Sequence, residues 1–530
     1  MAAFSPLDHA FDPEIFRAQG HAVVDALADY LAQACRGRMP VLPWVEPEEL
    51  VRQWPAEFPE LPAGRRQDAG ETAGKMPALR GRQDAGETAG KMPALRTAEV
   101  AAQTTQALRE LLIRTIAQSN HLHHPRYVGH QVTSPLPIAA VSELAMALLN
   151  DAMAVYEMGP AGAAIERNLA RWLADRLGLG TEADGVFTSG GSAGNLTSLL
   201  AARQTHAGFD VWDAGLHAGP PLAFLVSEQA HYSVQKAVQI MGLGKGGAAP
   251  VAVDENFRLR PEALPEALAR AQAAGRRVIG VSACSCSTAT GAFDPLEPIA
   301  EFCAARGLWL HVDGAHGACA SFSPKYRDLL KGIERADSVV WDAHKMILMP
   351  ALCTAVLFRD GRNSFHAFAQ HASYLFTHQR RAEERYDSAV RVLECTKRMM
   401  SFPLYAALYV WGTRLFSDYV TRTFDLGRRM GEMVRAEPDF DLPVTPECNI
   451  VCFRHTPPGM SGPALDALQG AIRRRLIADG SFYLVQTRLP TGLHLRVTLI
   501  NPLTGESDVA ELLKAVRAAG KSILQEQSPV

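Results

Sequence analysis

The stretch WDAHKMILMP, residues 341–350, places Lys345 directly after His344, at the end of the short apolar run 338–341. Such a run is typical of a buried strand. A buried ammonium is costly unless it is paired or loses its charge. A lone lysine in this position most often extends its amine to solvent. The alternative is a lysine whose amine forms a Schiff base with an aldehyde, and three other stretches of the chain bear on that choice.

A glycine-rich stretch, TSGGSAGN at 188–195, lies between an expected strand and an expected helix. Glycines let the backbone approach an anion, and the free N–H groups of a helix start attract it. Ser192 adds a hydroxyl donor. The pattern is neither a Walker loop nor a G-x-G-x-x-G dinucleotide fingerprint. It is therefore a candidate site for a phosphate group.

Two further stretches supply a carboxylate and an imidazole. In HVDGAHGA (311–318), Asp313 ends an apolar run, where a carboxylate either caps a helix or pairs with a buried cation. The small residues Gly314 and Ala315 leave room beside it for a flat group. In SEQAHYSVQKA (227–237), His231 follows a strand and precedes a helix, a position in which a lone histidine is more often structural.

A phosphate cradle, a ring-facing histidine, a carboxylate and a strand-end lysine match the needs of one cofactor. Pyridoxal phosphate requires a lysine for its aldehyde, an acid for its pyridine nitrogen, a group stacked on its ring and donors for its phosphate. We therefore predict that pyridoxal 5'-phosphate is the cofactor and that Lys345 holds it as a Schiff base.

The elements that position these groups alternate between short apolar runs and helical patterns. Helices are expected at 193–204 and 296–306, and strands at 185–189, 222–227, 277–283, 308–313, 338–343 and 354–358. This alternation predicts an α/β fold with a mostly parallel sheet flanked by helices. Ligands bind such sheets at the carboxyl ends of the strands, which is where the four stretches lie.

Three parts are expected along the chain. Residues 1–98 form a helical segment, with Asp12 and Pro13 suited to begin its first helix. Within it, RQDAGETAGKMPALR at 66–80 recurs unchanged at 82–96, and two short copies are too few for a solenoid, so a flexible insertion is expected. The remaining parts are a large cofactor domain at 99–402 and a small α+β domain at 403–530, with strands at 449–454 and 493–501 and a helix at 507–519.

Composition narrows the class of protein. The chain has 530 residues, 47% of them hydrophobic, and a formal net charge of −3, which argues against nucleic acid or an anionic membrane as a partner. Its 9 cysteines include Cys284 and Cys286 in a C-x-C, but no second pair has zinc-site spacing, so no metal site is expected. The histidines of HLHH (121–124) are expected to be structural or to face a substrate. With neither a signal peptide nor a membrane span evident, a soluble cytoplasmic protein is expected.

Four stretches carry a resemblance to a known family: FDPEIFRAQGHAVVDALADYL (11–31), GVFTSGGSAGNLTSLLAAR (185–203), SEQAHYSVQKA (227–237) and the long stretch from HVDGAHGA to VVWDAHKM (311–346). The chain resembles the group II pyridoxal-phosphate-dependent amino acid decarboxylases over nearly its whole length. Members act on aromatic amino acids, histidine, glutamate or cysteine sulfinate. The resemblance implies the fold type I of pyridoxal-phosphate enzymes and N-terminal helices that wrap around a second subunit.

The resemblance also implies a role for each matching residue. Asp313 would keep the pyridine nitrogen protonated, and Ala315 and His231 would pack on the two faces of the ring. The residues that would hold the phosphate are Gly191, Ser192, Asn195 and His344. The residues that would line the substrate site are Thr133, His130 and Gln131.

Two segments differ in how closely they follow the family. In SACSCSTATGAFDP (282–295), Cys286, Ser287 and Thr288 occupy the place of the family's usual Gly-Thr-Thr, so Ser287 or Thr288 would supply a cofactor-binding hydroxyl. The charged segment 372–398 resembles the family's catalytic loop. Tyr386 in this segment would return a proton to the substrate carbon after carbon dioxide leaves. In the family this loop acts on the partner subunit, so the resemblance implies an obligate homodimer.

Decarboxylation of an L-amino acid is therefore the expected activity. Related aldehyde synthases typically alter the loop tyrosine or the stacking histidine, whereas Tyr386 and His231 are both present here. An aminotransferase or a cofactor-free scaffold would be less consistent with these residues. The sequence favours an aromatic substrate slightly over an acidic one, because His130 stands where the acidic branch has a substrate-binding glutamine, with Gln131 one residue later. Diaminobutyrate is a third option for the substrate.

Overall fold

The structure, a computed structural model, describes residues 13–42, 97–368 and 386–527. The tandem repeat, Asp12 and residues 372–385 of the expected catalytic loop lie outside the described residues. The chain divides into two compact units: one within 1–124 and 477–482, the other within 125–476 and 483–530. Each unit is described by itself.

The first unit is built on two long helices that pack against each other, α2 (Pro13–Ala34) and α4 (Thr97–Ala117). His121 binds backbone carbonyls through both ring nitrogens, with Nδ1 2.6 Å from the oxygen of Pro40 and Nε2 2.8 Å from that of Ile116. This histidine is therefore structural. The expected domain limit at 98/99 would cut α4 after its second residue.

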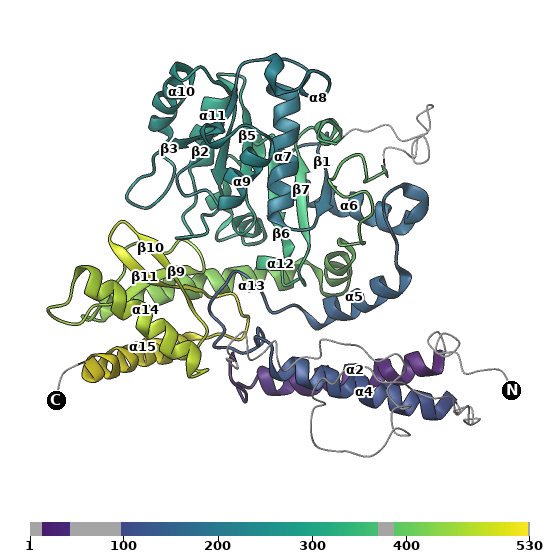
Figure 1. Cartoon of the computed structure of the whole chain (residues 1–530), viewed down its shortest axis with the longest axis vertical. Coiled ribbons are helices and arrows are strands. Elements are labelled where there is room, and N and C mark those ends of the chain that lie inside the picture. Colours follow the sequence, from purple (N-terminus) through teal and green to yellow (C-terminus); the bar gives the residue numbers. More distant parts are fainter. Residues whose placement is uncertain (1–12, 43–96, 369–385, 528–530) are drawn as a thin grey trace, which may run out of the picture. The chain divides into compact units, whose positions relative to one another are not determined.

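A seven-stranded sheet forms the centre of the second unit (Figure 1). Its strands are β1 (Asp184–Thr188), β2 (Leu222–Ser227), β3 (Ala248–Val251), β4 (Arg277–Cys284), β5 (Trp309–Asp313), β6 (Ser338–Asp342) and β7 (Thr354–Phe358). The order is β1-β7-β6-β5-β4-β2-β3, with β7 antiparallel to both of its neighbours and the remaining pairs parallel. The expectation of a mostly parallel sheet is confirmed. Strand β3 was missed, because its residues AAPV are half exposed and form no apolar run.

Helices cover this sheet, and α7 lies across one face of it (Figure 1). The helices of this region are α5 (Pro137–Leu149), α6 (Pro160–Arg176), α7 (Gly191–His206), α8 (Val211–Ala214), α9 (Tyr232–Ile240), α10 (Leu264–Ala273), α11 (Leu296–Ala304) and α12 (Ala343–Met346). Large side chains such as Trp309, Trp341 and Phe224 are fully buried between the layers. Burial of such side chains contributes about 2–3 kcal/mol each, and it fixes the strand ends that carry the polar groups.

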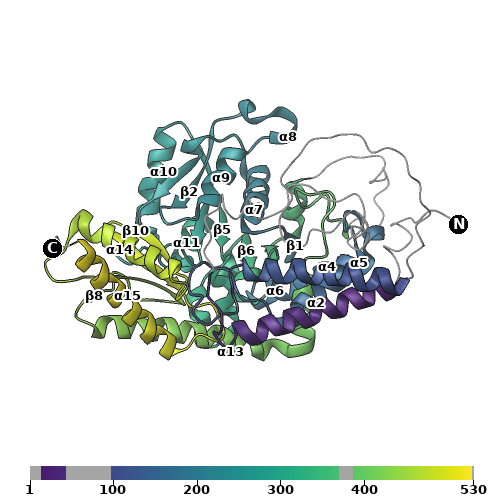
Figure 2. The same cartoon turned by 60° about the horizontal axis from the view of Figure 1, so that its bottom comes forward.

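A second, antiparallel sheet follows in the order β10-β11-β9-β8. Its strands are β8 (Phe440–Asp441), β9 (Ile450–His455), β10 (Val485–Leu489) and β11 (Gly492–Thr498), and its helices are α13 (Phe402–Ala436), α14 (Gly462–Ala478) and α15 (Glu506–Gln527). The long α13 runs along the base of the unit and contacts β8 and β9 of this sheet as well as α5 and α6 (Figure 2). The two sheets thus belong to one compact unit, and the expected limit at 402/403 stays a prediction.

Three general findings concern the described part of the chain. No helix there is long and apolar enough to cross a membrane. That part also holds no group of three or more His, Cys, Asp or Glu side chains arranged to bind a metal ion. The cysteines are all free thiols.

Candidate active site

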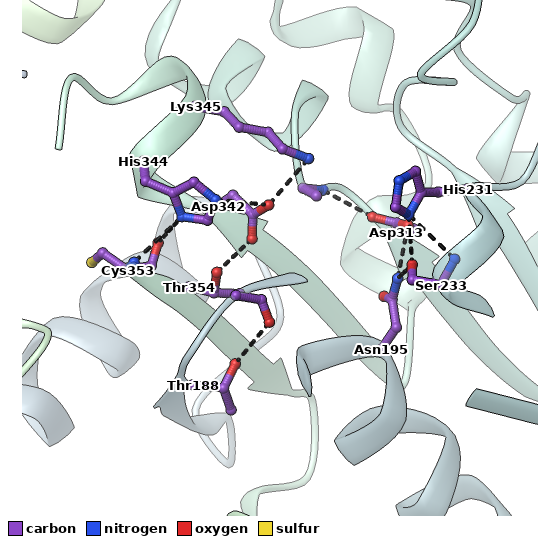
Figure 3. A network of polar contacts seen from close by, with 12 residues as sticks. Thr188, Asn195, His231, Ser233, Asp313, Asp342, His344, Lys345, Cys353 and Thr354 are labelled. Atoms are coloured by element: carbon purple, nitrogen blue, oxygen red, sulfur yellow. Dashed lines mark hydrogen bonds and ion pairs between the residues drawn. The ribbon is translucent and has the colours of Figure 1, made fainter. Parts of the chain in front are cut away.

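Lys345 lies where β6 ends, in the single turn of α12. Its Nζ is 3.1 Å from Oδ2 of Asp342, the last residue of β6. Asp342 is almost fully buried, and its second carboxylate oxygen accepts a hydrogen bond from Thr354 Oγ1 at 2.6 Å. The lysine therefore does not extend to solvent; its ammonium is held by a buried carboxylate (Figure 3).

Two carboxylates decide the charge of Lys345. Burial by itself lowers the pKa of the ammonium, but the negative charges of Asp342 and Asp313 outweigh burial, and the pKa is raised above its usual value. Lys345 is therefore a cation in the chain as described. To attack an aldehyde, its amine must first give up a proton.

Asp313 ends β5 and is buried. Its Oδ2 accepts a hydrogen bond from Asn195 Nδ2 at 2.9 Å, and its Oδ1 accepts one from the N–H of Ala315 at 3.2 Å. Asp313 thus has the burial and the orientation required of a partner for a cationic ring nitrogen.

The amide of Asn195 is occupied on all sides. Its Nδ2 donates to Asp313 and also to Ser233 Oγ at 2.9 Å, and its Oδ1 lies 3.0 Å from Nε2 of His311. Burial lowers the pKa of His311 to about 4, so this histidine is neutral. The amide has no donor left for a phosphate. The geometry therefore makes Asn195 an orienting partner of Asp313, and its expected contact with a phosphate stays a prediction.

His231 is the N-cap of α9, and its Nδ1 is 2.7 Å from Ser233 Oγ. Figure 3 shows its ring beside the carboxylate of Asp313. Burial lowers the pKa of His231, while the charge of Asp313 opposes this effect. Ala315, the second residue expected to face the cofactor ring, is buried and lies two positions after Asp313. The two expected ring contacts stay predictions.

The glycine-rich turn leads from β1 into α7. Gly190 has φ 117°, a conformation that favours glycine, and α7 begins at Gly191. A Cβ atom on Gly191 would lie only 3.0 Å from Asp342 Oδ2, so the turn passes closely over the Lys345 site. Ser192 lies in the first turn of the helix, where backbone N–H groups have no intrahelical acceptor. His344 Nε2 lies 3.6 Å from Asp342 Oδ2.

The segment that departs from the family pattern is compact. Ser287 Oγ is 2.8 Å from Thr290 Oγ1, so this hydroxyl is used within its own turn, and Thr288 is half buried. Cys286 is buried with its Sγ 3.9 Å from Sγ of Cys448. The expected cofactor contacts of Ser287 and Thr288 stay predictions.

Sequence reasoning missed Arg496, which lies on β11. It is 5% exposed, and its Nε and Nη2 have no hydrogen-bond partner among the described residues. Burial lowers the pKa of His316 to about 3, and the charges of Lys345 and Arg496 act in the same direction. A buried guanidinium without a carboxylate is costly. The signal was present: an arginine inside the apolar run LHLRVTLIN.

The structure also places the residues expected to line the substrate site. Thr133 is buried, and its segment meets the Lys345 region through a hydrogen bond from the N–H of Leu136 to the carbonyl of Leu348 at 2.8 Å. The ring of His130 lies 5.9 Å from that of Tyr483, and burial followed by the charge of Arg496 lowers its pKa. Gln131 is adjacent to His130 and partly buried.

Tyr386 belongs to a different group of side chains. Its ring centroid is 5.5 Å from that of Tyr156, and the guanidinium of Arg167 lies 4.8 Å from the ring centre. The structure thus brings together Lys345, Asp313, His231 and the glycine-rich turn, and it gives Tyr386 its own setting.

Comparison with known proteins agrees with this geometry. The family described as "Pyridoxal-dependent decarboxylase conserved domain" matches residues 94–456. Human cysteine sulfinic acid decarboxylase is 32% identical over 410 residues, 76% of this chain and 83% of that protein. An L-aspartate decarboxylase of Metarhizium robertsii is 32% identical over 407 residues, 75% of this chain and 80% of that protein. The crystal structure of mouse CSAD superposes with a TM-score of 0.82 at 27% identity, covering 96% of this chain and 99% of that one.

Proposed function

This chain belongs to the pyridoxal-dependent decarboxylase family, and on that premise we propose that it removes the α-carboxylate of an acidic L-amino acid. The family assigns the reaction class: a carboxy-lyase that uses pyridoxal 5'-phosphate to decarboxylate an amino acid. The choice of substrate and the role of each residue are the parts proposed here.

The residues present fit the cofactor. Asp313, buried and held by Asn195 and Ala315, suits a protonated pyridine nitrogen. The turn at Gly191 has space that a Cβ atom would fill, beside free N–H groups of a helix start. Lys345 supplies an amine close to both. When bound, pyridoxal phosphate supplies an electron-accepting ring that stabilises the carbanion left by carbon dioxide.

The side chains of the protein then have distinct tasks. Lys345 binds the aldehyde carbon once its ammonium has lost a proton. Asp342 holds that ammonium in place beforehand, at 3.1 Å. Asp313 keeps a proton on the ring nitrogen, and Asn195 fixes the plane of the Asp313 carboxylate. Tyr386 returns a proton to the substrate carbon.

Arg496 is the observation that supports binding of a substrate carboxylate. A guanidinium that is buried and lacks partners for two of its donors, Nε and Nη2, suits a carboxylate of the substrate. Every amino acid has an α-carboxylate, so Arg496 by itself does not choose a side chain. Acidic substrates are favoured because cysteine sulfinic acid, acidic amino acids and L-aspartate are named for the relatives that are 31–32% identical. This reverses the slight preference for an aromatic substrate.

A substrate panel tests the proposal. We expect carbon dioxide and amine from L-aspartate, L-glutamate or cysteine sulfinate, and at least about tenfold lower kcat/KM for L-tryptophan, L-tyrosine and 2,4-diaminobutyrate. Arg496→Met should raise KM about tenfold or more, since it removes a charged hydrogen-bond donor. Arg488→Met, at an exposed arginine of β10 paired with Asp466, is the matched control. Preference for an aromatic substrate would refute the acidic proposal, and hydrogen peroxide release would indicate an aldehyde synthase instead.

We also propose a homodimer with shared active sites. Helices α5 and α13 pack on each other and expose Val141, Leu148, Tyr409 and Trp411, of which Tyr409 is 83% exposed. An exposed apolar surface of this kind is typical of an interface. Mixing the inactive Lys345→Ala variant with the weakly active Tyr386→Phe variant should restore about a quarter of the wild-type activity, because a hybrid dimer has one intact site. No recovery after subunit exchange would refute shared sites. A cytoplasmic location stays a prediction.

A further inference from the structure

Four charged side chains are buried on one side of β1. Glu166 of α6, Asp184 of β1, Arg391 and Lys397 are each 4–6% exposed. Lys397 Nζ is 2.5 Å from Glu166 Oε1, and Arg391 Nη2 is 3.3 Å from Asp184 Oδ2. We call these residues the buried clamp. Burying ion pairs brings little net stability compared with apolar residues of the same size, so the buried clamp calls for another explanation.

The two cations of the buried clamp come from an irregular stretch, 386–398, which we call the anchor segment. All of its residues are described, and they form no α-helix or β-strand, so backbone ladders do not position it. Lys397 also donates to the carbonyl of Phe187 at 2.9 Å, and Ser189 Oγ donates to Glu394 Oε1 at 2.5 Å. The anchor segment therefore runs along β1 and reaches the glycine-rich turn that follows it.

Arg391 has a further connection, to the chain just after β7. Its Nε donates to Ser364 Oγ at 2.8 Å, and its guanidinium lies 4.8 Å from the ring centre of Phe365. Ser364 and Phe365 precede residue 369, whereas Arg391 follows residue 385. Arg391 thus joins Ser364 and Phe365 to the anchor segment, and it connects both to Asp184 of β1.

Tyr386 stands at the start of the anchor segment, five positions before Arg391. The next residues are bound to the stretch 153–156: the N–H of Tyr156 donates to Asp387 Oδ1 at 2.8 Å, and the N–H of Ala389 donates to the carbonyl of Ala154 at 3.0 Å. Arg167, which lies over the Tyr386 ring, approaches Asp184 at 3.9 Å. Asp184 therefore lies near two guanidinium groups. One belongs to Arg167 and lies over the Tyr386 ring, and the other belongs to Arg391 of the anchor segment.

From this geometry we infer that Arg391 is a positioning residue for Tyr386. Arg391 joins residues 364–365, the anchor segment and β1. It thereby fixes the position from which the Tyr386 hydroxyl protonates the substrate carbon. The inference rests on the proposed function, because it assigns Arg391 a role through Tyr386. The competing explanation is that Arg391 only adds to the stability of the fold.

A double-mutant cycle on the complete holoenzyme separates the two explanations. Arg391→Lys keeps the charge but cannot reach Ser364 and Asp184 together, because lysine lacks the planar fork. We expect kcat to fall about tenfold with KM changed less than about twofold, since small misplacements of a reacting group cost this much or more. In a Tyr386→Phe background the same change should lower the residual kcat by less than about twofold.

Two further variants keep the test decisive. Arg517→Lys alters a comparable arginine, bound to Asp439 through two contacts of 2.7 Å in the small sheet region, and should lower thermal stability without lowering kcat. Ser364→Ala removes only one partner of Arg391 and should lower kcat about threefold, again only when Tyr386 is present. This variant serves if Arg391→Lys does not fold.

Each outcome has one meaning. A loss of kcat that vanishes in the Tyr386→Phe background supports the positioning role. An equal loss in both backgrounds, or a lower melting temperature with unchanged kcat, overturns it while the proposed function stands. Absence of turnover in the unmodified enzyme with every amino acid would overturn the proposed function and, with it, the role of Arg391.

Discussion

Replacement of Asp342 by asparagine should speed cofactor loading at neutral pH. The carboxylate of Asp342 lies 3.1 Å from Lys345 Nζ and is the foremost group that raises the pKa of this buried ammonium. An opposite charge within about 4–6 Å shifts a pKa by about 1–3 units. Asp342→Asn should therefore lower the pKa of Lys345 by about that amount. Below this pKa, each unit gives about tenfold more neutral amine.

Stopped-flow absorbance can follow loading of the cofactor-free protein. With wild type, the rate should rise with pH throughout the neutral range, because a raised pKa keeps the amine protonated. With Asp342→Asn, the rate at pH 7 should be at least about tenfold higher, and its plateau should move to lower pH. Loss of a negative charge beside Gly191 could also favour the phosphate. Pyridoxal without phosphate removes that second effect and should show the same gain.

The control is Asp425→Asn, which breaks a Lys325–Asp425 pair of 2.5 Å whose partners are 55% and 43% exposed. It should leave the pH profile of loading unchanged. The reasoning is refuted if Asp342→Asn leaves the pyridoxal rate and its plateau where they are in wild type, or shifts the plateau upward.

Three further predictions concern the same site. Asp313→Asn should retain the visible band of bound cofactor but lower kcat about a hundredfold or more, because the ring nitrogen loses its charged partner; carbon dioxide release measures this, and near-normal turnover would contradict it. Gly191→Ala should weaken binding of pyridoxal phosphate about tenfold while leaving pyridoxal unaffected, as its Cβ would lie 3.0 Å from Asp342; equal losses for both would argue against a phosphate turn. The native chain binds the His316 proton only near pH 3, whereas an unfolded chain binds it near pH 6.5, so this group costs stability as pH falls between these values. His316→Gln should flatten that decline in the free energy of unfolding by up to about 1.4 kcal/mol per pH unit; denaturant unfolding at several pH values measures it, and an unchanged slope would refute it.

Much of the site followed from residue types at strand ends. Lys345, Asp313 and His231 were recognised because a polar residue after a buried run is unusual, and the shared edge of a parallel sheet brings such residues together. The partners of Asn195 could not be predicted in this way, since only coordinates show that its amide is used by Asp313, Ser233 and His311. Short-range patterns do not reveal which distant partner saturates a hydrogen-bonding group.

Arg496 shows a second limit of prediction from the sequence. It is a cation next to apolar residues just as Lys345 is, yet its strand belongs to the antiparallel sheet, 151 positions further along the chain (496 − 345). Its meaning depends on tertiary packing, which buries the guanidinium and leaves its Nε and Nη2 without hydrogen-bond partners among the described residues. Likewise, β3 was missed because half-exposed alanines and a proline become a strand only through pairing with β2.

Strand β1 lies at the margin of the seven-stranded sheet, with a ladder to β7 on one side. Edge strands open locally at a lower free-energy cost than central strands, and hydrogen exchange reports such opening. The glycine-rich turn continues directly from β1, so a cofactor whose phosphate is bound there would hold the strand closed. At a thousandfold excess over Kd, ligand binding adds about 4 kcal/mol to the closed state. Depletion of the vitamin that supplies this cofactor would thus remove that contribution and make β1 and the turn after it easier to open.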